Sequence, residues 1–448
     1  MTQPTLFWFR NDLRVKDNAT LKQVHDSDIP CIPIHILDRK LSKLQMSLQI
    51  ACLTSLRESL GELYVFQSNK PYSVIRRLVH KYQIGTVACN HDPEYHARDQ
   101  EHLVDDSYQL MQAKGNDLSA VWHEPPGSYT TARKWVLSEV EDAVAGVQTL
   151  QIHRDDALYQ ERHYYPLPEH EGKHPRQQAW KRFRKFRSHI PGFQKPDTAP
   201  NALEPETSVL SRYLARGCIG VRELWHKVHA DVEATLADDQ RSFLGQLIWR
   251  EYYRMLAYQD PNFHQQEGNR YSKQLDYGYE RDDHFRAWKY GKTGYPFVDA
   301  CMRQLRREGW IHHLARHMVA CFLTRGDLYL HWELGEEVFD QWLIDRDYAI
   351  NAGNWMWVSA SAFFHQYYRI YSPIAFGKKT DPSGEYIRKY VPILANYPDK
   401  YIYQPWEAPL KVQQEAGCII GEDYPAPIVD HAQASKRNLK RLKSANQK

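Results

Sequence analysis

The sequence predicts two domains, an α/β domain with a Rossmann-like parallel sheet and, after it, an all-helical domain. In the first third of the chain, short apolar runs alternate with amphipathic stretches, a pattern typical of the strands and helices of a parallel sheet. From about residue 208 onward, apolar residues recur at helical spacing and no strand-rich stretch returns. At 448 residues the chain is also too long for one core of ordinary size.

The elements follow in chain order. The expected strands are the apolar runs 5–9, 31–37, 63–66, 86–89 and 118–122. The long amphipathic windows expected to form helices of the second domain are 239–258, 297–307, 312–324 and 335–344. The turn-forming segment Glu-Pro-Pro-Gly at 124–127 is expected to end the first domain. We therefore predict an α/β domain over 1–125, a polar connector over 126–200 and a helical domain over 201–448.

Composition excludes several classes of protein. No stretch approaches the ~18 to 20 uncharged apolar residues of a membrane helix, and Arg10 interrupts the first apolar run, unlike a signal peptide. The seven cysteines are scattered without a Cys-x-x-Cys pair, which argues against a disulfide framework or structural zinc and favours reduced, buried thiols. We expect a soluble intracellular protein with no membrane partner, in the cytoplasm of a bacterium or the nucleus of a eukaryote.

The charge and aromatic content point to local rather than global features. A net charge of +3 does not by itself indicate nucleic-acid binding. Two basic clusters are open to interpretation as phosphate contacts or as solvated helix faces: Lys181, Arg182, Arg184, Lys185 and Arg187 in the connector, and Lys436, Arg437, Lys440, Arg441, Lys443 and Lys448 in the tail. Aromatic residues make up 13% of the chain, with 13 Trp and 29 Tyr, and suit a flat π-system ligand. The expected sheet lacks the G-x-G-x-x-G turn of a standard NAD site.

A histidine pair is the first candidate for chemistry. His313 and His317 are four residues apart in an expected helix and therefore share one face. Acid/base work is one interpretation, because imidazole titrates near neutral pH. A zincin site would need Glu directly after the first His, where Leu314 stands. A buried, purely structural pair is the third interpretation, and the residues alone leave these open.

Two further windows suggest a bound ligand. Asp345 and Asp347 precede a small-residue turn bracketed by tryptophans, and Arg316 is expected to pair with one of these carboxylates. The window 207–211 offers hydroxyl groups and backbone N–H groups before an amphipathic segment. That arrangement receives phosphate or forms an ordinary helix cap.

Taken together, these windows resemble the photolyase and cryptochrome family over nearly the whole chain. The match begins at Phe-Trp-Phe-Arg-Asn-Asp-Leu-Arg, 7–14, and is most specific between Gly245 and Tyr390. Gly-Gln-Leu-Ile-Trp-Arg-Glu at 245–251, the string Gly-Trp-Ile-His-His-Leu-Ala-Arg-His at 309–317, and Phe-Gly-Lys-Lys-Thr-Asp-Pro at 376–382 are most similar to the eukaryotic-type (6-4) photolyases and animal cryptochromes.

The resemblance implies an FAD cofactor in the helical domain. Its phosphates would lie on Thr207, Ser208, Leu210 and Ser211, with Arg316 paired to Asp345, Asp347 accepting from the flavin ring or ribose, and Asn351 facing flavin N5. Gln246 and His313 complete the implied cofactor contacts. The family's N-terminal domain also holds an antenna chromophore. The helical region 40–62 looks shortened here, so the antenna is left unidentified.

The resemblance also implies light-driven repair of UV-damaged DNA by a monomer, most closely of the (6-4) photoproduct. Gln246 stands where the main microbial cyclobutane-dimer enzymes carry Glu, and His313 and His317 stand where they carry Asn and Met. His313 would act as general acid, with His317 beside it. The implied lesion and DNA contacts are Gln246, Trp249, Trp357, Arg369, Lys378 and Lys379.

Two alternatives stay open, a cryptochrome photoreceptor without repair and a cyclobutane-dimer photolyase. Asn351 and a chain that ends soon after the conserved segment favour repair over light sensing. For electron transfer, Trp355 and Trp332 match the first two members of the family's tryptophan chain. Tyr277, Tyr279 and Tyr329 stand near the outer positions, where tyrosine can carry a hole only by losing a proton.

Overall fold

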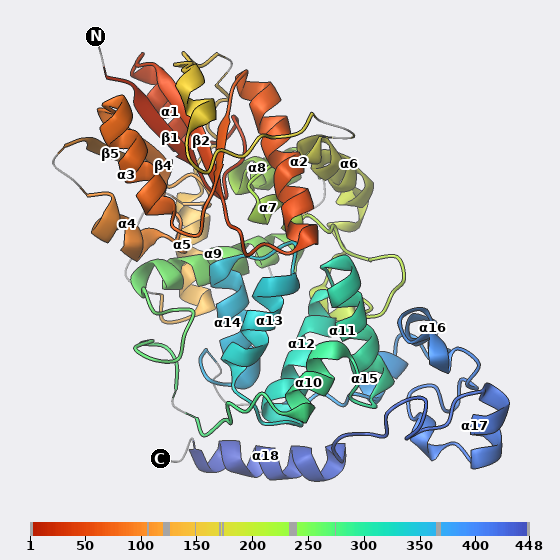
Figure 1. The fold of residues 1–448 in the computed structure, drawn as a ribbon. Helices are drawn as coiled ribbons and strands as arrows, with labels where there is room; N and C mark the ends of the chain where they lie inside the picture. Colours follow the sequence, from red (N-terminus) through yellow and green to blue (C-terminus); the bar gives the residue numbers. More distant parts are fainter. Residues whose placement is uncertain are drawn as a thin grey trace. The chain divides into compact units, whose positions relative to one another are not determined.

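The computed structural model describes residues 3–104, 107–119, 126–147, 149–169, 172, 174–232, 240–273, 275–363 and 369–445. The chain forms two compact units, which we call the sheet unit and the helical unit (Figure 1). The sheet unit consists of Met1–Lys195, Ser208–Pro261 and Asp347–Ala349, and the helical unit of Pro196–Thr207, Asn262–Arg346 and Ile350–Lys448. None of the described helices combines the length and apolar character needed to cross a bilayer.

The sheet unit contains a five-stranded parallel sheet in the order β3-β2-β1-β4-β5. The strands are β1 (Thr5–Phe9), β2 (Cys31–Leu37), β3 (Tyr64–Gln67), β4 (Thr86–Asn90) and β5 (Gln109–Ala113). The crossover helices between them are α1 (Ala19–Asp26), α2 (Lys43–Leu60), α3 (Pro71–Tyr82) and α4 (His96–His102). This is the doubly wound arrangement of a Rossmann-like domain, so the predicted fold class is confirmed for this part of the chain.

One strand prediction was wrong. The fifth strand is Gln109–Ala113 and not 118–122, because Leu118 and Ser119 lie in a loop; residues 120–122, like 124 and 125 of the expected domain end, lie outside the described residues. β5 is an edge strand that pairs only with β4 and carries glutamines at both Gln109 and Gln112. An edge strand needs less apolar surface than a central one, so its sequence signal is weak.

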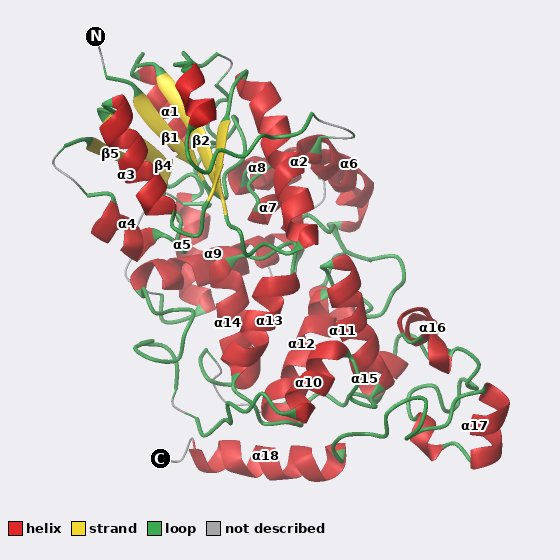
Figure 2. Cartoon of the chain, viewed as in Figure 1, coloured by secondary structure: helices red, strands yellow, loops and turns green. Residues whose placement is uncertain are grey.

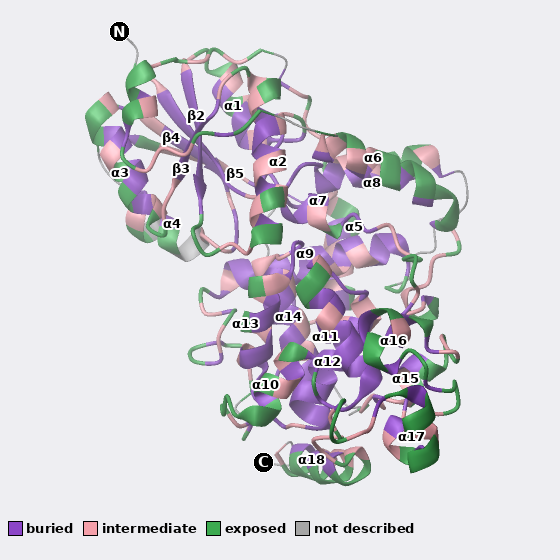
Figure 3. Ribbon diagram, turned by 45° about the vertical axis from the view of Figure 1, so that its right-hand side comes forward, coloured by how far each residue is buried: buried purple, intermediate pink, exposed green. Residues whose placement is uncertain are grey.

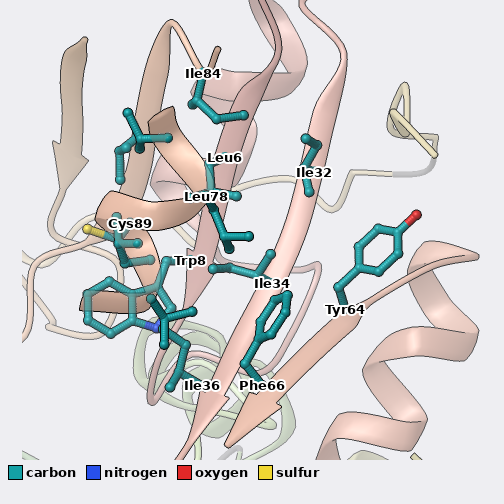
Figure 4. Packing of buried hydrophobic residues seen from close by; sticks show 14 of the residues in the cluster. Leu6, Trp8, Ile32, Ile34, Ile36, Tyr64, Phe66, Leu78, Ile84 and Cys89 are labelled. Atoms are coloured by element: carbon teal, nitrogen blue, oxygen red, sulfur yellow. The ribbon is translucent and has the colours of Figure 1, made fainter. Parts of the chain in front are cut away.

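Alternation along β1 and β2 builds the core of the sheet unit. Leu6 and Trp8 of β1 point to the same face as Ile32, Ile34 and Ile36 of β2, as expected from the two-residue period of a strand (Figure 4). The apolar face of α3 covers this surface. The polar residues that follow β1 are thereby held at the carboxyl edge of the sheet.

The sheet unit also contains helices beyond the sheet, α5 (Tyr129–Glu139), α6 (Pro175–Phe186), α7 (Ser211–Ala215), α8 (Val221–Asp231) and α9 (Phe243–Gln259). The predicted basic helix is confirmed within α6. It buries Phe183 and Phe186 and leaves its lysine and arginine side chains at 181, 182, 184 and 185 exposed.

In the described residues of the helical unit, helices and loops replace strands (Figure 2). The helices are α10 (Asp283–Tyr290), α11 (Pro296–Glu308), α12 (His313–Cys321), α13 (Trp332–Trp342), α14 (Tyr348–Ser359), α15 (Ala375–Lys378), α16 (Glu385–Tyr390), α17 (Leu410–Ala416) and α18 (His431–Ala445). The first two residues of α14 are counted with the sheet unit. α11 and α12 are largely buried (Figure 3), which makes this part of the chain a stable support for side chains.

Candidate functional site

The histidine pair lies at the start of α12. His312 caps this helix, since its Nδ1 accepts from the backbone N–H of Leu314 at 3.1 Å. One turn of helix then brings the rings of His313 and His317 to 4.3 Å, inclined at 63°. His313 is half-buried and His317 is only 8% exposed, so His313 is the member that a ligand reaches more easily.

Aromatic rings hold His317. Its imidazole lies nearly parallel to Trp357 at 5.2 Å and to Tyr371 at 6.4 Å. The guanidinium of Arg369 lies 5.4 Å from the ring of Tyr371. In the described part of the chain, no three His, Cys, Asp or Glu side chains gather as a metal site would require. The two imidazoles therefore form a pair in which His317 packs against aromatic rings.

The expected ion pair between Arg316 and Asp345 is present. Arg316 Nη2 donates to Asp345 Oδ2 at 2.8 Å, and Arg316 Nε donates to the carbonyl of Ile311 at 3.1 Å. The side chain of Arg316 is 22% exposed, whereas that of Asp345 is 2% exposed. The guanidinium is therefore fixed on one side and open on the other.

Asn351 is held by α13. Its amide nitrogen donates to the carbonyl of Glu336 at 3.1 Å and to Asp340 Oδ1 at 3.0 Å. Burial, together with the charge of Asp340, raises the pKa of Glu336 well above its usual value. Because α13 fixes the amide nitrogen, the carbonyl oxygen is the end of Asn351 oriented away from these bonds.

Asp347 belongs to the sheet unit, where an arginine network holds it. Arg254 of α9 lies 3.5 Å from Asp347 Oδ2 and donates to Asp117 Oδ1 at 2.5 Å, while Tyr258 donates to Asp117 Oδ2 at 2.9 Å. Burial alone would raise the pKa of Asp117, but Arg254, with Arg250 and Lys114, outweighs it and holds the pKa at about 2. The sequence analysis missed Arg254 and Asp117. The signal was a row of polar residues four apart on α9: Gln246, Arg250 and Arg254.

The phosphate candidates precede α7. Thr207 is counted with the helical unit, and Ser208, Leu210 and Ser211 with the sheet unit. Ser208 Oγ accepts from the N–H of Leu210 at 3.4 Å, and Val209 has a positive φ of 52°. The N-cap of α7 is Leu210, which provides no side-chain acceptor. Residues 207–211 therefore do not form an ordinary side-chain cap for α7.

The expected electron-transfer tryptophans are buried in the helical unit, Trp355 at 2% exposure and Trp332 at 0%. A Cβ atom on Gly335 would collide with the ring of Trp355, so glycine is needed where α13 approaches α14. Trp288, which the sequence analysis did not single out, meets Trp355 edge-on at 6.3 Å. Trp288 lies on a short helix with few apolar residues beside it in the sequence, so no pattern there indicated a buried tryptophan.

The candidate tyrosines form two branches from His331. The ring of His331 lies 5.6 Å from Trp332 and stacks on Tyr279 at 4.2 Å. It also meets Tyr277 edge-on at 6.3 Å, and Tyr277 lies 4.5 Å from Tyr329. Tyr279 is 52% exposed, whereas Tyr277 and Tyr329 are 5% and 4% exposed.

The predicted lesion contacts occupy different environments. In the sheet unit, Trp249 stacks one face on Tyr129 at 4.2 Å, and the amide of Gln246 donates to the carbonyl of Gln240 at 2.8 Å. In the helical unit, the side chains of Lys378 and Lys379 on and beside α15 are exposed. Exposed lysines suit phosphate contacts, and a half-buried tryptophan suits stacking on a base.

Two family models match the chain. Residues 5–134 match "DNA photolyase", and residues 243–444 match "FAD binding domain of DNA photolyase". A parallel α/β part followed by this helical domain defines a flavoprotein of the photolyase class, and the second match supports FAD as the cofactor.

Relatives extend the match over the whole chain. A "(6-4)DNA photolyase" of Arabidopsis thaliana is 36% identical over 495 residues, covering 98% of this chain and 88% of that protein. "Cryptochrome-2" of Gallus gallus is 34% identical over 504 residues, covering 99% and 83%. A "(6-4)DNA photolyase" of rice is 53% identical over 256 residues, which are 56% of this chain and 46% of the rice protein. The chain belongs to the photolyase and cryptochrome family.

Solved structures agree on the fold. A bacterial class III photolyase from Agrobacterium tumefaciens superposes with a TM-score of 0.79 at 28% identity, over 100% of this chain and 98% of that one. A cryptochrome from Synechocystis superposes with a TM-score of 0.82 at 23% identity, over 98% and 99%. The helical domain predicted for the second part of the chain is therefore confirmed.

Proposed function

We propose that the protein is a DNA photolyase of the (6-4) type, which uses blue light to repair a flipped-out (6-4) photoproduct in UV-damaged DNA. The observation that carries the proposal is the histidine pair, in which the ring of the half-buried His313 stands 4.3 Å from the ring of His317, which packs on Trp357. The similarity to the Arabidopsis (6-4) photolyase over 98% of this chain supports it.

The donor set of the helical unit fits the polar edge of a flavin. Arg316 offers a guanidinium that is open on one side, beside the buried carboxylate of Asp345. Asn351 presents its carbonyl oxygen, since α13 holds its amide nitrogen, and a carbonyl is the acceptor that an N5–H group requires. From the sheet unit we assign Asp347 to the flavin ring or ribose. We assign the phosphates to Thr207, Ser208, Leu210 and Ser211, and further cofactor contacts to Gln246 and His313.

When bound and reduced, FAD would supply the light-driven electron that starts repair and would receive it back when repair ends. The chain supplies the proton. His313 donates it to the hydroxyl group that migrates within the lesion and later takes it back, a task suited to imidazole because its proton is exchanged near neutral pH. His317 positions His313 and does not itself touch the lesion, because Trp357 and Tyr371 flank its ring.

The remaining assigned residues hold the DNA. Trp249 and Trp357 offer faces for the extruded bases, and Gln246 offers an amide to their edges. Lys378, Lys379 and Arg369 are exposed cations, which position a phosphate backbone without reading its sequence.

A light-sensing function is the second candidate, because the chicken cryptochrome is nearly as similar to this chain, at 34% identity over 99% of it. A sensor needs the same FAD residues, Arg316, Asp345 and Asn351. It does not need His313 to act on a lesion. The two functions therefore differ in what the histidine pair does.

The test illuminates the reduced, FAD-loaded protein with blue light in the presence of DNA carrying either a (6-4) photoproduct or a cyclobutane dimer. Chromatography then counts each lesion. We compare His313→Ala with His284→Ala, which replaces an exposed histidine on α10. We expect the wild type and His284→Ala to repair only the (6-4) lesion. In His313→Ala the repair of this lesion should fall about 100-fold or more.

Other outcomes overturn parts of the proposal. Repair of only the cyclobutane dimer would replace the assigned lesion and leave FAD and the fold in place. No repair by a protein that binds and photoreduces FAD would favour the light sensor.

A further inference from the structure

Two cysteines meet inside the sheet unit. The Sγ atoms of Cys52 and Cys218 lie 2.9 Å apart, although 166 residues separate them in the sequence. Both are free thiols, 2% and 3% exposed. The other five thiols are buried without a second sulfur in hydrogen-bond contact in the described part of the chain.

Backbone hydrogen bonds fix both partners. Cys218 follows α7, where its N–H donates to the carbonyl of Tyr213 at 2.9 Å and its carbonyl accepts from Arg176 Nη1 at 3.2 Å. Arg14 Nη1 donates to the preceding carbonyl, that of Gly217, at 3.2 Å. Cys52 lies in the interior of α2, a helix closed at its start by a capping box and at its end by Gly61. The short distance between the sulfurs is therefore built into the fold.

A pocket gives access to the pair. Cys52 and Cys218 both line a pocket of about 210 Å³, together with Lys16, Ser55 and Arg176. A water molecule occupies about 30 Å³ in the liquid, so a molecule as small as hydrogen peroxide fits with room to spare.

We propose that Cys52 and Cys218 form a reversible redox modification site, which hydrogen peroxide converts to a disulfide and a dithiol reductant converts back. The site is independent of the proposed repair function, because neither sulfur belongs to the assigned FAD or lesion residues.

The chemistry needs no other reagent. One thiol loses its proton and its sulfur attacks an oxygen of hydrogen peroxide. The O–O bond breaks, a sulfenic acid forms, and the departing hydroxide takes up the lost proton as water. The second sulfur then attacks the sulfenic sulfur, the S–O bond breaks, and a second water leaves. Two electrons have passed from the two sulfurs to peroxide. The disulfide bond is about 2.05 Å long, so the sulfurs approach by less than about 1 Å.

Burial controls the rate of the first step. It raises the pKa of the Cys52 thiol well above its usual value, with the neighbouring thiol of Cys218 adding to this, so little thiolate is present. The pair therefore stays reduced in a reducing cytosol and responds to sustained rather than brief oxidant.

The test treats the full-length protein with hydrogen peroxide, blocks remaining thiols under denaturing conditions and maps peptides by mass spectrometry without reduction. We expect the number of free thiols to fall from seven to five. The Cys52 and Cys218 peptides should be joined by a disulfide that dithiothreitol cleaves. Cys52→Ser and Cys218→Ser should each abolish this cross-link. Cys418→Ala, which removes a buried thiol outside the pair, should keep it.

Two outcomes overturn the proposal. One is seven free thiols at a peroxide dose that already oxidises the methionines of the folded protein. The other is Cys52 converted to a sulfinic acid, or linked to another cysteine. Cys52→Ala serves if the serine variant does not fold, and the wild-type peptide map decides the matter without either variant.

Discussion

Arg10–Asp99 in the sheet unit and Arg316–Asp345 in the helical unit are the same chemical pair in two surroundings. Both oxygens of Asp99 accept from Arg10, at 2.7 and 2.8 Å, and Tyr72 and Gln112 also donate to this carboxylate, each at 2.9 Å. The side chains of Arg10 and Asp99 are 2% and 1% exposed, whereas that of Arg316 is 22% exposed. A closed pair contributes to folding alone, and a pair open on one side is available to a ligand.

The sharpest way to break this comparison is to remove one partner of the closed pair. Arg10→Met leaves the buried carboxylate of Asp99 without its counter-charge, and we expect the free energy of unfolding to fall by about 3–5 kcal/mol in urea titrations. The bound FAD per folded molecule should not change. The double variant Arg10→Met/Asp99→Asn should recover much of the loss. A loss below about 1 kcal/mol in the single variant would contradict the assignment.

A buried carboxyl group with a more distant cation should make stability depend on pH: Glu251 Oε2 lies 3.8 Å from Arg250 Nη1, against 2.7 Å between Asp99 and Arg10. Burial, with the nearby charge of Asp117, raises the pKa of Glu251 from 4.5 to about 7. The folded protein then holds a proton that the unfolded chain releases, so this stability is full below pH 4.5 and lost as the pH rises to about 7. Relative to Glu251→Gln, the wild type should lose on the order of 3 kcal/mol across this window.

Unfolding titrations of the wild type and Glu251→Gln at a series of pH values measure that difference. The glutamine keeps the acceptor for the N–H of Ser119, at 3.4 Å in the wild type, and removes only the titration. A difference that is flat between pH 4.5 and 7 would show that Glu251 ionises in the folded protein as it does in the unfolded chain.

The open pair should separate folding from cofactor binding. Arg316→Met is expected to lower the free energy of unfolding of the apoprotein by only about 1–2 kcal/mol, because solvent reaches the guanidinium side. The dissociation constant of FAD should rise about tenfold or more, since a charged donor is lost. Arg316→Lys keeps the charge but not the two directed hydrogen bonds, so its dissociation constant for FAD should lie between those of the wild type and Arg316→Met. Fluorescence titration with FAD measures the affinity, and an unchanged affinity would place the flavin elsewhere.

These pairs also show what a sequence can predict. Four of the five strands and the helices α9, α11, α12 and α13 follow from apolar periodicity alone, and the contact of His313 with His317 follows from a spacing of four on one helix. Local patterns suffice wherever the partners are neighbours in the chain. The edge strand β5 was missed because Gln109 and Gln112 interrupt its apolar run.

Contacts made by tertiary packing escaped the sequence analysis. Arg254 and Asp117 are 137 residues apart, and Cys52 and Cys218 are 166 apart. Each residue taken alone is an ordinary member of its helix or loop. The pairing of Arg316 with Asp345 was anticipated only because opposite charges flanked a suspected ligand site, with the family resemblance pointing the same way.

A third pair, Arg441–Asp276, extends the comparison to the surface and gives the smallest expected effect on stability. Its side chains are 41% and 63% exposed, and the guanidinium lies 3.8 Å over the ring of Tyr329, whose hydroxyl donates to Asp276 Oδ1 at 2.8 Å. The hydrogen bond from Arg441 lowers the pKa of Asp276, so this carboxylate is charged at neutral pH. An exposed pair of this kind contributes less than about 1 kcal/mol to stability.

Its expected role is to accept a proton. An oxidised tyrosine must release its phenolic proton, and Asp276 is a base already bonded to the hydroxyl of Tyr329. We expect Asp276→Asn to lower the yield of tyrosyl radical on illumination several-fold, because an amide does not take up that proton. Electron paramagnetic resonance of the illuminated protein measures the yield. Tyr279→Phe is the matched control, since Tyr279 stacks on His331 and not on Tyr329. If Tyr279→Phe abolishes the radical and Asp276→Asn leaves it intact, the hole ends on the exposed branch, and the surface pair is only an ion pair.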